Sequence, residues 1–159
     1  YYQQAMSITT RSGVLPNRYN YLDLDTSYKN AFGQPLMRLT FDFKDNEHRM
    51  GMHGADIVNQ MISAMNPNKS SKASGAKRNW GFTPYQSTHN TGGTIMGTTP
   101  GNSAVNKYQQ SWDCHNLFLV GANVFPHNSA YQPTGLVGAM AYWTADAIKN
   151  KYLKNPGLL

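Results

Sequence analysis

The spacing of hydrophobic residues predicts strands in the first part of the chain. Residues 36–43 alternate apolar with polar side chains, which is typical of a strand with one covered face. Residues 6–10 form a second candidate strand. Turn-forming residues at 13, 16–17 and 32–34 lie between or beside these segments. The pattern therefore predicts β structure interrupted by turns.

The period changes to that of a helix at residues 45–66. Apolar side chains recur three and four positions apart between Ile57 and Met65, which predicts an amphipathic helix. Asp45 is the expected N-cap, and Asn66, which precedes a proline, is the expected end. The methionines fall on the same stripe as the isoleucines, so we expect core packing rather than metal ligation.

The last third of the chain has the order strand, loop, buried helix. Residues 117–120 form a short apolar run that fits a strand buried on both faces, and Gly121 ends it. Pro133 is expected at the first position of a helix. Residues 136–148 are apolar or small on almost every side, so this helix should be covered on most faces. This order is common where α/β sheets bring a ligand to a helix N-terminus.

Composition narrows the classes of function. The chain has 159 residues, and its hydrophobic content of 40% is enough for a core. The formal net charge is +6, but only 14% of residues are charged, which argues against an extended nucleic-acid surface. A single cysteine, Cys114, excludes an internal disulfide and a multi-cysteine metal site. No apolar run approaches the roughly 20 residues that span a bilayer.

One group of basic residues stands out in a Ser/Gly/Pro-rich loop. It comprises Lys69, Lys72, Lys77 and Arg78. Such a loop is usually a solvated surface segment. Contact with an acidic partner or an anionic membrane face is the alternative.

A glycine-rich stretch follows His89. Its glycines imply tight turns or close approach of the backbone to another group, a frequent need where a cofactor packs on main chain. A lone histidine in a polar loop is usually a surface residue, although an imidazole can also transfer protons. No phosphate-binding loop, GxGxxG, HExxH or usefully spaced carboxylate pair is present. The glycines are Gly92, Gly93, Gly97 and Gly101.

Three ordered motifs carry a family resemblance. The segments THNTGGTIMG, NLFLVGANVFP and QPTGLVGAMAYWTADAI follow one another in the chain. Together they resemble the C-terminal region of the glucose-methanol-choline (GMC) family of FAD-dependent oxidoreductases. The segments SAVNKYQQSWD and PTGLVGAMAYW most resemble its branch of bacterial gluconate, ketogluconate and fructose dehydrogenase flavoproteins.

The resemblance implies an α/β (α+β) fold in two parts. Residues 1–98 would belong to a substrate-binding domain with a mostly antiparallel sheet and a helix. Residues 99–159 would supply the last strand and helix of an FAD-binding Rossmann-like domain. The family's dinucleotide-binding glycine motif is absent from these residues. The chain is therefore expected to be the C-terminal portion of a larger flavoprotein and inactive alone.

The resemblance also implies a reaction and its partners. FAD would accept a hydride at flavin N5 from the CH–OH group of a sugar, polyol or sugar acid. The N-terminal portion of the flavoprotein would hold the rest of FAD, and no nucleic acid would be bound. In this branch a cytochrome subunit accepts the electrons, which implies a periplasmic protein associated with the membrane through that partner.

Individual roles carry over at matching positions. His89 matches the family's catalytic histidine, which acts as base or hydrogen-bond partner of the substrate hydroxyl. Asn123 and Val124 match positions that approach FAD. The second catalytic position, normally Asn or His, is Gln132 here, which keeps a donor and an acceptor but adds a methylene. His127 is a less favoured substitute for it.

The helix after Gln132 would face the flavin with its first turn. The resemblance places Pro133 and Thr134 beside the flavin, where helix N–H groups favour negative charge.

Two alternative functions of other classes are also compatible with the sequence. One is a non-catalytic carbohydrate-binding module that presents Trp80, Trp112 and the ten tyrosines to glycans, and the other is a basic nucleic-acid-binding domain.

Overall fold

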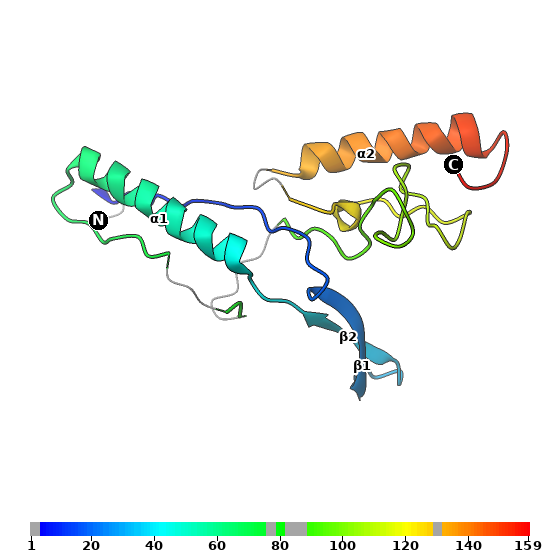
Figure 1. The fold of residues 1–159 in the computed structure, drawn as a ribbon, viewed down its shortest axis with the longest axis horizontal. Helices are drawn as coiled ribbons and strands as arrows, with labels where there is room; N and C mark the ends of the chain where they lie inside the picture. The colour runs from blue at the N-terminus through cyan, green and yellow to red at the C-terminus, as the bar shows by residue number, and fades with distance from the viewer. Residues whose placement is uncertain (1–3, 76–78, 82–88, 129–131) are drawn as a thin grey trace.

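The computed structural model describes residues 4–75, 79–81, 89–128 and 132–159. The described elements follow the order hairpin, long helix, irregular segment, second helix. Figure 1 shows the two helices in separate parts of an extended molecule, with the hairpin projecting away from both. The result is a small mixed α/β chain with a two-stranded antiparallel sheet, which agrees with the predicted fold class at this coarse level.

The sheet consists of β1 (Tyr21–Lys29) and β2 (Pro35–Thr40). The strands pair antiparallel, with Leu22 opposite Leu39, and the register shifts between Leu24 and Lys29. The predicted turn at 32–34 is confirmed, and Asn30 organises it. Asn30 Oδ1 accepts hydrogen bonds from the backbone N–H groups of Phe32 and Gln34 at 2.9 and 3.0 Å.

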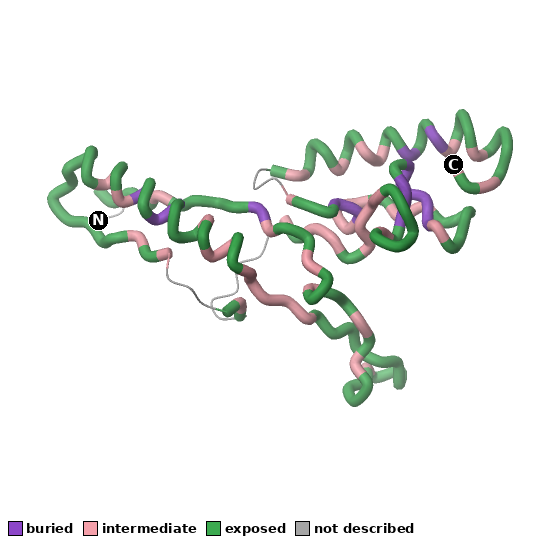
Figure 2. The backbone as a smooth tube through the Cα atoms, viewed as in Figure 1, coloured by how far each residue is buried: buried purple, intermediate pink, exposed green. Residues whose placement is uncertain are grey.

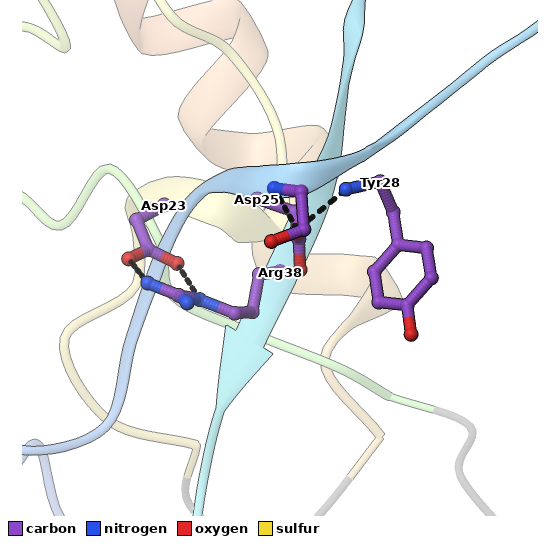
Figure 3. A network of polar contacts seen from close by, with 5 residues as sticks. Asp23, Asp25, Tyr28 and Arg38 are labelled. Carbon is purple, nitrogen blue, oxygen red and sulfur yellow. Dashed lines mark hydrogen bonds and ion pairs between the residues drawn. The ribbon is translucent and has the colours of Figure 1, made fainter.

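Two aspartates order the polar side of the hairpin. Figure 3 shows Asp23 and Arg38 facing one another from the two strands, where Arg38 Nε donates to Asp23 Oδ1 at 2.8 Å. Asp25 Oδ1 accepts from the backbone N–H groups of Ser27 and Tyr28 at 2.7 and 2.8 Å. These bonds occur where the ladder register shifts, so the Asp25 side chain replaces strand pairing there.

The predicted strand pattern is only partly correct. β2 ends at Thr40 rather than at residue 43, and the apolar face of the hairpin is not covered, since Leu24 is 63% and Leu39 is 47% exposed. Residues 6–10 form no strand. They run beside the long helix instead, where a Cβ on Gly54 would lie 2.9 Å from Thr10 Oγ1. A strand needs a neighbouring strand for its hydrogen bonds, and this helix cannot supply one.

The predicted amphipathic helix is confirmed as α1 (Asp45–Met65). Its N-cap is Lys44, one residue before the expected one, because Glu47 reaches back and accepts the Lys44 backbone N–H at 3.0 Å. Asn66 ends the helix in the left-handed conformation, as its position before a proline suggested. The expected core packing of the methionines is not seen, since Met61 is 47% exposed in this structure.

The core lies in the C-terminal part of the chain. Figure 2 shows buried residues gathered in the irregular segment beside the second helix. Val105, Val124 and Phe125 form its centre. The predicted strand at 117–120 is wrong: only an isolated bridge pairs Phe118 with Gln110. Its outer residues are roughly half exposed because no flanking strands of a larger sheet lie against it among the described residues.

The second predicted helix is confirmed as α2 (Thr134–Ala147), continued by one π-helical segment, η3 (Ile148–Tyr152). Pro133 is its N-cap rather than its first residue. The expected cover on most faces is wrong for this chain. Thr144 and Ala147 are buried, whereas Tyr142 is 83% exposed. An apolar helix needs cover on all sides, and the described residues cover one side only.

The surface of the chain is large for its mass. The solvent-accessible area is 12305 Å², whereas a compact protein of 17.7 kDa would have about 8,000 Å². No helix among the described residues has both the length and the apolar character that crossing a bilayer requires.

Candidate functional site

Two segments that sequence analysis singled out lie side by side. The backbone N–H groups of Gly92, Thr94 and Met96 donate to the carbonyl groups of residues 122, 123 and 124 at 3.0, 3.0 and 2.8 Å. The second segment includes the short 3₁₀ helix η2 (Ala122–Val124). The glycine-rich stretch after His89 and the stretch containing Asn123 therefore form one local unit, although about 30 residues separate them in sequence.

Glycine is required where this unit bends. Gly92 and Gly93 have φ angles of 87° and 110°, and Gly121 has 141°. An L-residue with a side chain rarely adopts these values. At Gly121 a Cβ would also lie 2.7 Å from Asn123 Oδ1. The glycine-rich pattern thus has a local structural cause here.

Asn123 and Val124 have different environments. Asn123 Nδ2 donates to Thr94 Oγ1 at 2.6 Å, so this partly buried side chain ties the two segments together. Val124 is fully buried in the core. Contact of either residue with a cofactor stays a prediction, and for Val124 it would have to involve the backbone.

His89 is partly buried and has an uncommon backbone conformation. Its φ angle is 63°, in the left-handed region. Its carbonyl oxygen accepts a hydrogen bond from Asn128 Nδ2 at 2.9 Å. Sequence analysis missed Asn128, because nothing in the local pattern signals a contact across 39 positions. His127, the less favoured substitute, is exposed.

The first turn of α2 is open. Gln132 and Thr134 are exposed and Pro133 is partly buried. No side chain caps the helix, and the Pro133 carbonyl accepts the Val137 N–H at 2.9 Å. Within the described residues no hydrogen bond joins Gln132 to His89. Their shared role in catalysis stays a prediction.

Other candidate features contribute less. No group of three or more His, Cys, Asp or Glu residues suited to a metal ion is found among the described residues. Lys69 and Lys72 of the basic loop are exposed, while residues 77 and 78 lie outside the described part.

The two tryptophans named for glycan binding are both packed within the chain. Trp80 lies edge-on to Phe41, with ring centroids 5.4 Å apart. Trp112 Nε1 donates to Ser103 Oγ at 3.0 Å. Neither ring is an open platform of the kind a sugar face needs. This weakens only the tryptophan part of the carbohydrate-binding alternative, since Tyr19, Tyr28 and Tyr142 are each more than 70% exposed.

The joined motifs agree with comparison to known proteins. Residues 16–141 match the C-terminal domain of the family described as GMC oxidoreductase, and the chain belongs to this family. It is 46% identical to the gluconate 2-dehydrogenase flavoprotein of Pantoea cypripedii over 159 residues, which is 99% of this chain and 26% of that protein. It is 33% identical to the fructose dehydrogenase large subunit of Gluconobacter japonicus over 139 residues, 86% of this chain and 24% of that protein.

A more distant relative acts on a different kind of alcohol. The 2-methyl-1,2-propanediol dehydrogenase of Mycolicibacterium austroafricanum is 27% identical over 138 residues, 87% of this chain and 24% of that protein. The chain thus spans about a quarter of the length of the relatives it matches. The predicted family and branch are confirmed. The names of the relatives describe dehydrogenases, one of them a flavoprotein.

Proposed function

We propose that this chain is the C-terminal portion of an FAD-dependent dehydrogenase that oxidises the CH–OH group of a sugar, polyol or sugar acid. One observation carries the proposal: the segment after His89 is bonded along the segment containing Asn123. In the family resemblance these segments supply the catalytic histidine and a cofactor contact. Their direct pairing supports the view that they act in one site.

The open start of α2 fits the isoalloxazine end of FAD. Apart from the helix's own backbone and the neighbouring residues, no atom of the described chain lies within 4 Å of the place where a Cβ on Gly135 or Gly138 would be, so a flat ring can approach there. The uncapped N–H groups of the first turn favour negative charge. When bound, FAD supplies the acceptor for a hydride from the carbinol carbon.

The residues of this chain would then manage the substrate. His89 takes the hydroxyl proton as the carbonyl product forms, a task suited to the basic ring nitrogen of an imidazole. The amide of Gln132 holds the substrate oxygen. Pro133 and Thr134 would hold the flavin end of FAD at the first turn of α2, whose N–H groups favour negative charge.

Two protein partners belong to the proposal. The N-terminal portion of the flavoprotein would hold the adenosine diphosphate part of FAD and cover the apolar faces of α1 and α2, of which Met61 and Tyr142 are exposed here. One relative is named a large subunit, which supports a further subunit. We assign it the role of a cytochrome electron acceptor, with a periplasmic location at the membrane.

The test is anaerobic reduction of the bound flavin in the flavoprotein that contains this chain, with gluconate, fructose and 2-methyl-1,2-propanediol as probes. His89→Ala should slow reduction by on the order of 10² to 10⁴ because proton transfer is lost. Gln132→Leu keeps bulk but removes both polar functions, so it should slow reduction by roughly 10- to 10³-fold. FAD content should not change in either variant.

His53→Ala is the matched control, since His53 is an exposed histidine of α1 outside the site. It should reduce at the parent rate. Reduction of the His89→Ala enzyme at the parent rate would remove His89 from the mechanism. A colourless native protein would reject the flavin assignment itself.

A further inference from the structure

His89 needs an external contact to keep its conformation. Its φ angle of 63° lies in the left-handed region, where residues other than glycine are uncommon and persist only when surrounding structure holds them. The backbone conformation sets the direction of the Cα–Cβ bond. Whatever fixes the peptide after His89 therefore also fixes where its imidazole points.

One side chain binds that peptide. Asn128 Nδ2 donates to the His89 carbonyl oxygen at 2.9 Å in a partly buried setting. Three residues later, the Gly92 N–H donates to the Ala122 carbonyl at 3.0 Å. The bend from His89 to Gly92 is thus fixed at both ends by the segment from 122 to 128.

Asn128 is itself held in place. Gly13 lies so close to it that a Cβ on Gly13 would come within 2.0 Å of the Asn128 backbone oxygen. The Asn128 Oδ1 atom is buried and has no hydrogen-bond partner within the described chain. A buried amide normally satisfies both of its ends, and within the described chain the bond to the His89 carbonyl is the polar contact of this side chain.

We propose that Asn128 is a positioning residue, which holds His89 in the left-handed conformation that directs its imidazole at the substrate hydroxyl. The proposal rests on the proposed role of His89. Asn128 acts through the backbone carbonyl of His89 and touches neither substrate nor cofactor. The N–H donor of its amide, rather than the shape of the side chain, carries the effect.

A double-mutant cycle in the FAD-loaded flavoprotein tests this inference. The measured quantity is the rate constant of anaerobic flavin reduction at saturating concentration of the best of the three probes. Asn128→Ala should lower it by on the order of 10- to 100-fold, the loss expected when a catalytic group is misplaced by about 1 Å. Substrate affinity and FAD content should stay near the parent values.

The same substitution should have no further effect in the His89→Ala background, because an effect transmitted through His89 disappears with the imidazole. An equal loss in both backgrounds would show that Asn128 acts on something else and would overturn the inference. If His89→Ala alone reduces normally, the proposed function has failed, and that result is separate from the behaviour of Asn128.

Two further variants separate bonding from packing. Asn128→Asp keeps the shape but replaces the Nδ2 donor with a carboxylate oxygen, so it should be at least as slow as Asn128→Ala. Parent-like reduction in Asn128→Asp would overturn the inference. The control is Asn59→Ala: Asn59 Nδ2 also donates to a backbone carbonyl, that of Ala73 at 3.2 Å, but far from His89 in sequence. It should reduce its flavin at the parent rate.

Discussion

Two consecutive glutamines, Gln109 and Gln110, show how strongly hydrogen bonding changes the cost of burial. Both are fully buried. The Gln110 amide donates to the carbonyl groups of His115 and Gly157, both at 2.7 Å, and accepts the Leu159 N–H at 2.8 Å. Both polar atoms of the Gln109 side chain lack partners within the described chain. The two residues can be compared directly, because their type and burial match and their hydrogen bonding differs.

We expect opposite effects when each glutamine is replaced by methionine, which has a similar shape. Gln109→Met should raise the free energy of unfolding by about 1 kcal/mol, because a desolvated amide without partners is removed. Gln110→Met should lower it by about 1 to 3 kcal/mol, because the four groups bonded to this amide, Asn106 Nδ2 among them, lose their partner. Denaturant unfolding of the flavoprotein that contains this chain measures both. Equal effects of the two substitutions would mean that Gln109 has a partner after all.

At the scale of elements, local hydrogen bonding decided what the sequence could predict. The helices α1 and α2 were predicted nearly to the residue, because their bonds are internal to each segment. The strand predictions at 6–10 and 117–120 were wrong, because strands depend on neighbours that a local pattern does not reveal. The pattern of residues 1–44 predicted β structure without fixing the bounds of β1, in which Leu22 and Leu24 alternate with aspartates.

The same reasoning applies to the candidate site. Glycine content and the family motifs identified His89 and Asn123, because each lies within a recognisable local stretch. The bond from Asn128 to the His89 carbonyl joins positions 39 residues apart, and no periodicity or composition encodes it. Sequence could therefore name candidate groups but not what holds them.

The hairpin should lose stability in acid. Hydrogen bonds from the backbone N–H groups of Tyr28 and Ser27 hold the pKa of the Asp25 carboxyl below its usual range. A carboxyl with a lowered folded-state pKa stabilises the fold above its unfolded value of about 3.9, and this contribution is lost as pH falls through the folded-state pKa. NMR titration of the Ser27 and Tyr28 amide signals in the flavoprotein measures this.

Asp25→Asn should keep an acceptor oxygen and remove the titration of these two amides. Asp23 titrates in the same acidic range, since its hydrogen bond to Arg38 also lowers its pKa. The Asp23→Asn variant is therefore the matched control, and it should leave the acid transition of the Ser27 and Tyr28 signals in place. A titration midpoint near the unfolded value in the parent would contradict the prediction.

At the scale of the whole molecule, the large surface is the main physical fact. The chain exposes 12305 Å², about half as much again as a compact protein of its mass. Such an excess supports the proposal that other parts of a larger flavoprotein cover much of its apolar surface. The hairpin has the same need, since an isolated two-stranded sheet is marginal in water.

The isolated chain should consequently fail to retain FAD. It offers only residues proposed for the isoalloxazine end and has no glycine motif to cradle the pyrophosphate. The expected result is a colourless 159-residue protein, with helix content checked by circular dichroism, beside a yellow full-length flavoprotein. Stoichiometric FAD on the folded isolated chain would contradict the proposal that the N-terminal portion holds part of the cofactor.

The close contact between Gly13 and the backbone of Asn128 has a consequence for biosynthesis. The contact closes a loop of about 115 residues, which costs roughly 4 kcal/mol of chain entropy by the logarithmic scaling of loop closure. A ribosome adds about 5 to 20 residues per second, so Gly13 is made on the order of 10 s before Asn128. During that interval the Asn128 side chain, which binds the His89 carbonyl, has not yet been made. Assembly of this site therefore waits until residue 128 has been made, and a nascent chain that stalls before residue 128 exposes an unfinished one.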